Sequence, residues 1–416
     1  MLKTVLLLTY YFEPCNYVAA NRPSTLAKEF IRNGYRVIVV TRHWNGNEKY
    51  WADYLASSTT GIQVEKRAEL IIHKLPYHAR PLPQNYFLRK IRLLSNFVSG
   101  KFHDELNYTQ FRPYVESVIE TNDIDLILVS SPPLNLIKLA YQLKEKYNLK
   151  YMVDIRDFQN NVVLNKSSEI SFRNKFVHFF IMLHVRKWFR QAELIFTVTP
   201  PFTRFIQEQA NRSTITVMNG YSEKLLSINE KPFERFHISY IGTLYHNAEL
   251  EILLNGLKAL YQQEFSHQII FNFVGTKANP DVAEKLMQVI PAANLILQDR
   301  IPQELAQKQA AQSQVLLVLG YKSMKGVFGT KIFEYMGLRK PVLLFPSDEG
   351  PMQEMITQDP FGVFCQNENE FVNAVRNYFT EWKETGQIKF NGNIEFIKQY
   401  SRENQYQKLL PYLKQI

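Results

Sequence analysis

Short apolar runs rich in β-branched and aromatic residues alternate with helical stretches along nearly the whole chain. This alternation predicts parallel sheets wrapped by helices, because a parallel strand needs a crossover before the next strand of its sheet. The series begins twice, and the mostly polar stretch 221–236 between the two series predicts a linker between two domains. The expected strands are residues 5–10, 36–41, 126–130, 151–153 and 194–198 before the linker, and 237–242, 269–274, 294–297, 315–319 and 341–345 after it.

The helical stretches of the first series and the length of the chain support two α/β domains. The stretches are residues 23–33, 135–147 and 172–190, and 416 residues are too many for one ordinary core. We expect two doubly wound, Rossmann-like domains that face a central cleft, with ligands at the carboxyl ends of the strands. The expected boundaries are 1–225 for the first domain, 226–390 for the second, and 391–416 for a helical segment that packs back toward the first domain.

The composition is that of an ordinary globular protein, with 45% hydrophobic and 21% charged residues. No run approaches the ~18–20 apolar residues of a membrane-spanning helix. Residues 1–9 resemble the apolar part of a signal peptide, but they continue into residues 10–14 without a small-residue cleavage site, which favours a buried first strand. The two cysteines, Cys15 and Cys365, are far apart, which excludes a disulfide framework and predicts a reducing cytoplasmic location.

The excess of positive charge lies entirely in the first half of the chain. Residues 1–230 contain 30 lysines and arginines against 20 acidic residues, whereas residues 231–416 contain 19 of each. The net charge of +10 therefore belongs to one domain. Such asymmetry indicates that this domain meets an anionic surface, either a membrane or a nucleic acid.

Residues 326–344 combine a glycine-spaced loop with a short helix. Gly329 precedes Thr330, a suitable helix N-cap, and the helix then presents Lys331 and Glu334 on one face. Free N–H groups at a helix start attract phosphate, Lys331 adds positive charge, and the carboxylate of Glu334 can accept hydrogen bonds from two sugar hydroxyls. These features outline a site for a nucleotide-diphosphate sugar. The alternative is an ordinary loop–helix–strand connection with a solvated Lys–Glu pair.

Charged residues follow the expected strand 151–153. Asp154, Arg156 and Asp157 stand at a strand end that faces the expected cleft. Asp154 and Arg156 have an alternative structural role, in which they pair with each other or cap neighbouring elements. Asp157 is the better functional candidate, because it is free to point into the cleft if the chain has already turned there.

These positions together resemble the GT-B glycosyltransferases, and within them the retaining family 4, the glycosyl transferases of group 1. The resemblance covers nearly the whole chain, and its landmarks occur in order. Its most specific parts are Lys-x-Phe-Glu-Tyr at residues 331–335 and Asn219-Gly220 at the domain junction. The other matching segments are residues 10–14, 21–27, 34–41, 125–133, 154–157, 192–199, 240–244, 273–275, 299–302 and 340–342.

The resemblance implies transfer of a sugar from a nucleotide-diphosphate donor with retention at the anomeric carbon. The departing phosphate takes the acceptor proton in such enzymes, and no protein nucleophile is needed. Glu334 would then hold the donor, while Asp157 would orient or activate the acceptor hydroxyl with Arg156 beside it. The implied donor-binding residues are Gly242, Thr243, Arg300, Ile301, Gly329, Thr330, Lys331 and Glu334, and the implied acceptor-side residues are Asn21 and Arg22.

Two positions depart from the family pattern. Gly326 stands where the family carries a second acid, eight residues before Glu334. Residues 244–247 read Leu-Tyr-His-Asn, where the family often carries an arginine or lysine for the diphosphate. Phosphate contact is then expected from Lys331, Arg300 or backbone amides.

Other chemistries receive little support from the sequence. Asp123-Ile-Asp125 matches a metal-binding D-x-D string, but it is better explained as the polar start of the strand that follows. The nine histidines show no ligand spacing, so we predict no metal and no other cofactor. No nucleic-acid-binding module is recognisable, so we predict no nucleic acid partner.

Three functions remain. The first is an active transferase in the assembly of a surface polysaccharide or glycoconjugate, acting on a glycan or lipid-linked acceptor. The second is another enzyme of this fold, such as a nucleotide-sugar epimerase, which would not need a basic first domain. The third is a non-catalytic, glycosyltransferase-like partner protein, consistent with Gly326 and the missing phosphate-binding cations.

Two acid-free segments of the first domain suggest contact with an anionic membrane. In residues 70–103, lysines and arginines are interleaved with aromatic and aliphatic residues. Residues 172–190 read as a helix with cations at both ends and the apolar run 179–183 between them, too short to span a bilayer but suited to lie in its surface. The alternative is domain core with basic, solvated ends. We predict a peripheral protein on the inner face of the membrane, docked through its first domain.

Overall fold

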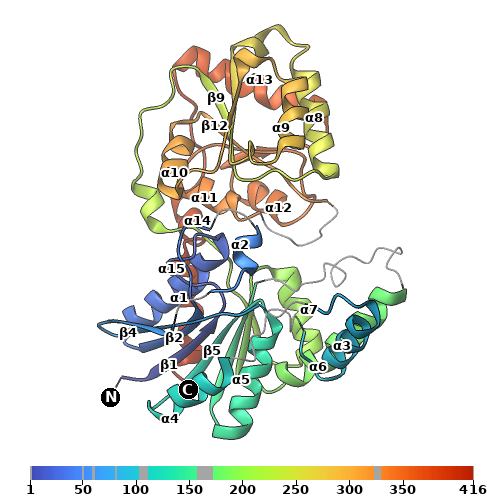
Figure 1. The fold of residues 1–416 in the computed structure, drawn as a ribbon. Coiled ribbons are helices and arrows are strands. Elements are labelled where there is room, and N and C mark those ends of the chain that lie inside the picture. Colours follow the sequence, from blue (N-terminus) through green and yellow to red (C-terminus); the bar gives the residue numbers. More distant parts are fainter. Residues whose placement is uncertain are drawn as a thin grey trace. The chain divides into compact units, whose positions relative to one another are not determined.

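The computed structural model describes residues 2–48, 51–58, 61–79, 82–102, 111–156, 172–322 and 329–415. The chain forms two compact units, each built of one sheet and its helices (Figure 1). Met1–Met218 and Tyr406–Ile416 make up the first unit, and Asn219–Gln405 make up the second. The sequence analysis placed the two divisions after residues 225 and 390.

The sheet of the first unit has the strand order β3-β4-β2-β1-β5-β6-β7-β8. Its neighbouring strands are parallel, except that β3 runs antiparallel to β4. From β1 the order extends outward in both directions, as in a doubly wound sheet. The strands are β1 (Thr4–Thr9), β2 (Arg36–Arg42), β3 (Gln63–Arg67), β4 (Leu70–Leu75), β5 (Leu126–Ser131), β6 (Lys150–Ile155), β7 (Leu194–Thr197) and β8 (Thr214–Thr216).

Helices cover both faces of this sheet. The helices of the first unit are η1 (Val18–Ala20), α1 (Asn21–Arg32), α2 (Trp51–Leu55), α3 (Tyr86–Val98), α4 (Arg112–Glu120), α5 (Leu134–Tyr147), α6 (Phe172–Phe189), α7 (Pro200–Ala210) and α16 (Leu410–Leu413). Helix α15 (Arg402–Gln407) begins in the second unit and ends in the first. Side chains of β1 point alternately to two cores, with Leu6 and Leu8 in one and Val5 and Leu7 in the other. Residues of α4 to α7 complete the first core, and residues of α1 complete the second.

The end of the chain packs in the first unit. Tyr406, Leu409 and Leu413 are buried in the same core as Leu26 and Phe30 of α1. Burial of these apolar side chains attaches the terminal segment to the first sheet, although the whole second unit separates it from that sheet in sequence.

The sheet of the second unit is entirely parallel and has the order β11-β10-β9-β12-β13-β14. Its strands are β9 (Phe236–Ile241), β10 (Ile269–Val274), β11 (Leu295–Gln298), β12 (Val315–Val318), β13 (Val342–Leu344) and β14 (Gly362–Phe364). Its helices are η5 (Glu223–Ser227), α8 (Ala248–Leu260), η6 (Glu264–Gln268), α9 (Pro280–Val289), η7 (Ala292–Asn294), α10 (Gln303–Gln312), α11 (Lys331–Gly337), α12 (Pro351–Gln358), α13 (Glu368–Thr385) and α14 (Ile394–Lys398).

The predicted fold class, two doubly wound α/β domains, is confirmed. The sequence analysis missed the strands β3, β4, β8 and β14. β8 and β14 have three residues each, which is too short for a periodic pattern, and β3 is a polar, largely exposed edge strand. β4 corrects part of the membrane prediction, because Leu70–Leu75 belong to the sheet and Leu70, Ile72 and Leu75 are buried there.

Candidate functional site

The second sheet changes its winding direction between β9 and β12. From β9 the chain moves outward through β10 to β11, and it then crosses to the other side of β9 with β12. In an open parallel sheet, the loops that follow two such strands diverge and leave a ligand site at the carboxyl ends. Gly242 and Thr243 follow β9, and α11 lies in the connection from β12 to β13.

Two glycines let the loops after β9 and β10 approach each other. Gly242 has a φ of +147° and Gly275 a φ of +89°, which other residues rarely adopt. The Gly242 N–H donates to the carbonyl oxygen of Val274 at 2.8 Å. A Cβ atom on Gly275 would lie 3.3 Å from the Gly242 carbonyl oxygen, to which Thr276 Oγ1 donates at 3.1 Å. Backbone without side chains therefore forms the floor of this corner.

Lys331 and Glu334 stand beside the Gly242 turn. They lie three residues apart on α11, and Lys331 Nζ donates to Glu334 Oε2 at 2.9 Å. A Cβ atom on Gly242 would lie 3.6 Å from Lys331 Cε, so the lysine stem is next to the turn. The Lys331 side chain is 31% exposed and that of Glu334 11%. A cation suited to phosphate and a carboxylate suited to hydroxyls thus occur together at the switch point.

Tyr335 attaches α11 to β9. Its hydroxyl accepts a hydrogen bond from the Ile241 N–H at 2.9 Å, and its side chain is fully buried. Burial raises the pKa of this phenol, so the hydroxyl stays neutral. At the other end of α11, Gly337 packs so closely on the Tyr221 ring that a Cβ atom would lie 2.5 Å from it. These contacts fix the helix that carries Lys331 and Glu334.

Arg300 reaches the same corner from the loop after β11. Its Nη2 donates to Thr243 Oγ1 at 3.0 Å, and its Cγ would lie 3.6 Å from a Cβ atom on Gly275. Ile301 follows it and is partly buried. The structure therefore brings together Gly242, Thr243, Arg300, Lys331 and Glu334, all of which the sequence analysis had selected; their binding of a donor stays a prediction.

The start of α11 differs from the expectation. Thr330 occupies the N-cap position, but its side chain forms no capping hydrogen bond. Its φ of −59° and ψ of −20° are helical, whereas a capping residue has extended backbone. Gly329 precedes it, and Gly326 lies outside the described residues. Thr330 therefore does not act as the expected cap, and its hydroxyl does not occupy the N–H groups of the first turn.

A buried ion pair fixes the carboxyl ends of β5 and β6 in the first unit. Arg22 Nε donates to both carboxylate oxygens of Asp154 at 2.9 and 3.0 Å, and Arg22 Nη2 lies 2.8 Å from Oδ1. Ser130 Oγ donates to Asp154 Oδ2 at 2.9 Å. Burial, the largest influence, would lower the pKa of Arg22, but the Asp154 carboxylate and Tyr406 together raise that pKa above its ordinary value. Asp154 therefore pairs with Arg22, whereas the structural alternative in the sequence analysis had paired it with Arg156.

Arg22 and Arg156, two residues predicted for the ligand site, bind backbone carbonyls in this structure. Arg22 Nη1 donates to the carbonyl oxygen of Val217 at 2.8 Å, and its side chain is 4% exposed. Arg156 follows β6 and donates from Nη1 to the carbonyl oxygen of Ala19. Asn21 opens α1 and is partly buried. Asp157 lies outside the described residues, and the proposed acceptor roles stay predictions.

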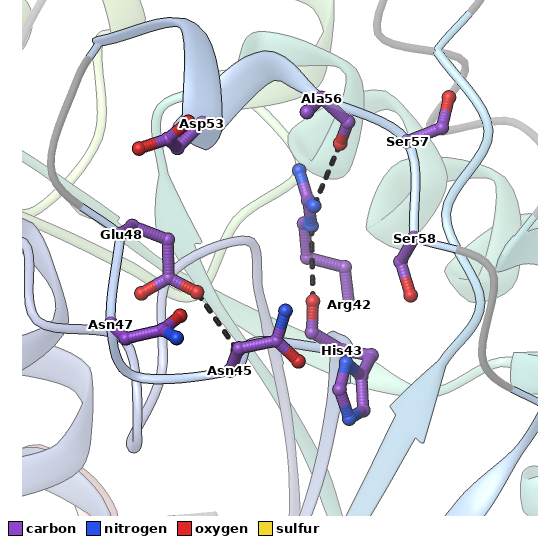
Figure 2. A pocket seen from close by; sticks show the side chains of 9 residues that line it. All are labelled: Arg42, His43, Asn45, Asn47, Glu48, Asp53, Ala56, Ser57 and Ser58. Carbon is purple, nitrogen blue, oxygen red and sulfur yellow. Dashed lines mark hydrogen bonds between the residues drawn. The ribbon is translucent and has the colours of Figure 1, made fainter.

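A polar pocket of about 330 Å³ lies next to the end of β2 (Figure 2). Arg42 donates from Nη2 to the carbonyl oxygen of Ala56 at 2.8 Å and lies over the Trp44 ring at 4.1 Å. Glu48 Oε1 accepts from the Asn45 N–H at 2.8 Å, while Glu48 Oε2 is buried with no hydrogen-bond partner among the described residues. The pocket is lined by Arg42, His43, Asn45, Asn47, Glu48, Asp53, Ala56, Ser57 and Ser58.

The sequence analysis named no residue of this pocket. Glu48 is one acid in an ordinary loop, and no local pattern distinguishes it from other surface acids. Burial lowers the pKa of His43, as do Lys74 and Arg42, so this imidazole is neutral near pH 7. Neutral hydroxyl, amide and imidazole groups beside a carboxylate suit a ligand with several hydroxyl groups.

No three His, Cys, Asp or Glu side chains come together as a metal site anywhere in the part of the chain that the structure describes. The predicted independence of metal stays a prediction.

The second unit matches a family model, and the whole chain is similar to several solved structures. Residues 235–381 match the family model described as glycosyl transferases group 1. No curated protein matches the chain in sequence. Among solved structures, the chain is similar to sucrose-phosphate synthase from Thermosynechococcus elongatus, with 13% identity, coverage of 99% of this chain and 98% of that one, and a TM-score of 0.69.

Two further structures have the same fold over the full length. One is a UDP-forming α,α-trehalose-phosphate synthase from Burkholderia vietnamiensis, with 10% identity, coverage of 100% and 99%, and a TM-score of 0.66. The other is HepE from Anabaena in complex with UDP and glucose, with 14% identity, coverage of 100% of both chains, and a TM-score of 0.62. The chain therefore has the GT-B fold, and its second unit matches the glycosyl transferases group 1.

Proposed function

We propose that this protein transfers a sugar from a nucleotide-diphosphate donor to an acceptor hydroxyl. The observation that carries the proposal is the cluster of Lys331, Glu334, Thr243 and Arg300 around the Gly242 turn, at the switch point of the unit that matches glycosyl transferases group 1. Structural neighbours solved with UDP and glucose, or with UDP-2-fluoro glucose, support a donor of this class.

The side chains of the cluster divide the donor between them in this proposal. Lys331 and Arg300 are its cations, so they bind the diphosphate and stabilise the negative charge that grows on the departing phosphate. Glu334 accepts hydrogen bonds from two ribose hydroxyls. Gly242 and Gly275 have no side chains, so the backbone beside Lys331 and Arg300 is uncovered. A bulky diphosphate can therefore approach this backbone closely.

The first unit supplies the acceptor side. Asp157 orients or activates the acceptor hydroxyl, and Arg156 stands next to it in sequence. The Arg22–Asp154 pair acts by fixing the end of β6, and Arg156 and Asp157 follow that strand in the sequence. The pocket beside Glu48 is a second place for acceptor hydroxyls, because Glu48 Oε2 has no hydrogen-bond donor among the residues that the structure describes.

The finer parts of the proposal come from the sequence. Retention of the anomeric configuration rests on the family resemblance, and independence of metal and other cofactors rests on the lack of ligand spacing among the histidines. The proposed acceptor is a glycan or a lipid-linked molecule in surface polysaccharide assembly. A non-catalytic glycosyltransferase-like protein is the second candidate, favoured by Gly326 at the position of the family's second acid.

A panel of nucleotide sugars, each with and without a chelator, tests the proposal. We expect one donor to be hydrolysed slowly to free nucleotide, with no effect of the chelator. With an acceptor, NMR of the product should show the anomeric configuration of the donor. Nucleotide binding without turnover would favour the non-catalytic candidate, and conversion of the donor into its epimer would favour an epimerase. Failure to bind any nucleotide would refute the proposal.

A further inference from the structure

Helix α3 has one packed face and one apolar face turned to solvent. The helix begins at Tyr86, where Asn85 Oδ1 accepts hydrogen bonds from the N–H groups of Phe87 and Leu88 at 3.0 and 3.1 Å. Its solvent face carries an apolar stripe of Phe87, Ile91, Leu94 and Val98, which are 69%, 50%, 61% and 62% exposed. Their spacing of four, three and four residues places them on a single side of the helix.

The opposite side of α3 is attached to α6. The Phe97 ring packs on Phe102 with centroids 5.9 Å apart, and Phe102 packs on Trp188 of α6 at 6.0 Å. Gly100, with a φ of +64°, lies so close to α6 that a Cβ atom there would be 3.0 Å from His184 Nδ1. The two helices lie side by side at the edge of the first unit (Figure 1). The apolar stripe is therefore presented by an ordered helix and is not needed for its packing.

The surroundings of the stripe are cationic. Arg89 and Lys90 are exposed on α3, and Lys90 Nζ lies over the Tyr86 ring at 4.4 Å. The sequence has no acidic residue from 70 to 103 or from 172 to 190. On α6, Phe179 and Leu183 are also exposed, and α6 carries cations in its last turn. Arg89, Lys90 and Arg92 belong to α3, and Lys101 follows it closely. Of the cations in the last turn of α6, Arg186 donates to Gln209 and Lys187 lies over the Tyr141 ring.

We propose that this α3–α6 surface docks the protein onto an anionic lipid bilayer, with α3 lying in the plane of the interface. The apolar stripe enters the acyl boundary, and the lysines and arginines extend to the phosphate groups. None of the helices in the described ranges is long and apolar enough to cross a bilayer. Attachment is thus peripheral and reversible, through partial insertion and charge.

The chemistry of the surface favours a bilayer over other occupants. A second copy of the chain would bring the same acid-free, cationic surface against itself, which like charges oppose. Nucleic acid would meet the cations, but three of the four residues of the stripe, Ile91, Leu94 and Val98, are aliphatic and have no flat ring on which a base could stack. An anionic lipid surface offers negative charge and hydrocarbon together, which matches both the cations and the apolar stripe.

Membrane docking is a property separate from the proposed sugar transfer, and it can be tested without an activity assay. Co-sedimentation with vesicles of phosphatidylcholine alone, or mixed with phosphatidylglycerol, should show binding to the anionic vesicles at low salt that falls at high salt. No binding at low salt, or equal binding to both vesicles, would overturn the proposal while leaving nucleotide binding, measured separately, unaffected.

Paired variants locate the surface. The double substitution Ile91→Ser and Leu94→Ser should weaken partition about 100-fold, and Arg89→Gln with Lys90→Gln about fivefold per cation. Matched controls in the second unit are Met287→Ser with Leu305→Ser, which also removes two exposed apolar side chains, and Lys231→Gln with Lys277→Gln. The control variants should bind like the parent protein. Equal loss in control and test variants would refute this location.

A dye reports insertion directly. Both native cysteines are buried, so a cysteine introduced by Leu94→Cys can be labelled selectively with a polarity-sensitive dye. Its emission should shift to the blue with anionic vesicles, and a dye at Leu305→Cys should not respond. A shift that instead follows protein concentration without lipid would show that a second copy covers the stripe, and would overturn the lipid assignment.

Discussion

Replacing Asp154 with asparagine should strongly destabilise the first unit. The carboxylate makes three contacts of 2.8–3.0 Å with the Arg22 guanidinium, and the side chains of Asp154 and Arg22 are 0% and 4% exposed. A neutral amide at this position would leave the positive charge of Arg22 buried without a counter-ion. Removing one partner of a buried ion pair costs about 3–5 kcal/mol, and we expect a loss of unfolding free energy in that range.

Urea unfolding followed by tryptophan fluorescence measures this loss. Trp44, Trp51 and Trp188 belong to the first unit, and the fourth tryptophan to the second, so the signal mainly reports the first unit. Lys28→Gln is the matched surface control, because it breaks the exposed Lys28–Glu13 pair and should cost at most about 1 kcal/mol.

A double variant separates unpaired charge from lost packing. Arg22→Met combined with Asp154→Leu removes both charges and should be more stable than Asp154→Asn alone. The reasoning is refuted if Asp154→Asn changes the unfolding free energy no more than Lys28→Gln does. It is also refuted if the double variant is as unstable as the single one.

Three further predictions concern other positions. Burial and Arg235 lower the pKa of His237 from 6.5 to about 4. As the pH falls, the unfolded chain therefore binds a proton at this histidine before the folded protein does, and the unfolding free energy should fall by about 1 kcal/mol from pH 7 to 5. His237→Gln should abolish this part of the pH dependence in urea titrations. Asp157→Asn should reduce transfer about 100-fold or more in kinetic assays while calorimetry shows unchanged nucleotide affinity, and equal loss of both would contradict the acceptor role. Gly275→Ala should lower the melting temperature and weaken nucleotide binding, because its φ of +89° is strained for alanine and its Cβ would press on the Gly242 carbonyl.

Local sequence patterns predicted two kinds of helix or strand. They are the strands that are buried on both faces, and the helices on which functional residues recur at helical spacing. Residues 5–8 are an unbroken apolar run because β1 is central and covered on both sides, and this run is visible in the sequence. The spacing of Lys331 and Glu334 placed both on one face of a helix, as the structure has them. Residues 214–216 of β8 carry no comparable pattern, since three residues cannot show a period.

Contacts between distant residues could not be predicted in this way. Asp154 and Arg156 are neighbours in sequence, which suggested that they pair, whereas Arg22 is 132 residues from its actual partner. The parallel order of β1, β5 and β6 brings the two together, and no local pattern encodes it. The environment of Glu48 Oε2, which has no hydrogen-bond partner among the described residues, likewise depends on the fold of the loop that follows β2.

Nucleotide binding by Glu334→Ala tests the central claim most directly. Losing a carboxylate that holds two sugar hydroxyls should cost about 2–4 kcal/mol, which weakens binding of the nucleotide about 100-fold or more. Glu395→Ala is the matched control, because it also removes an acid from an i,i+3 pair, with Lys398 at 2.9 Å, in the same unit. Calorimetric titration with the nucleotide that the parent protein binds should show the loss for Glu334→Ala alone. Unchanged affinity in a folded Glu334→Ala protein would contradict the assignment of the donor site.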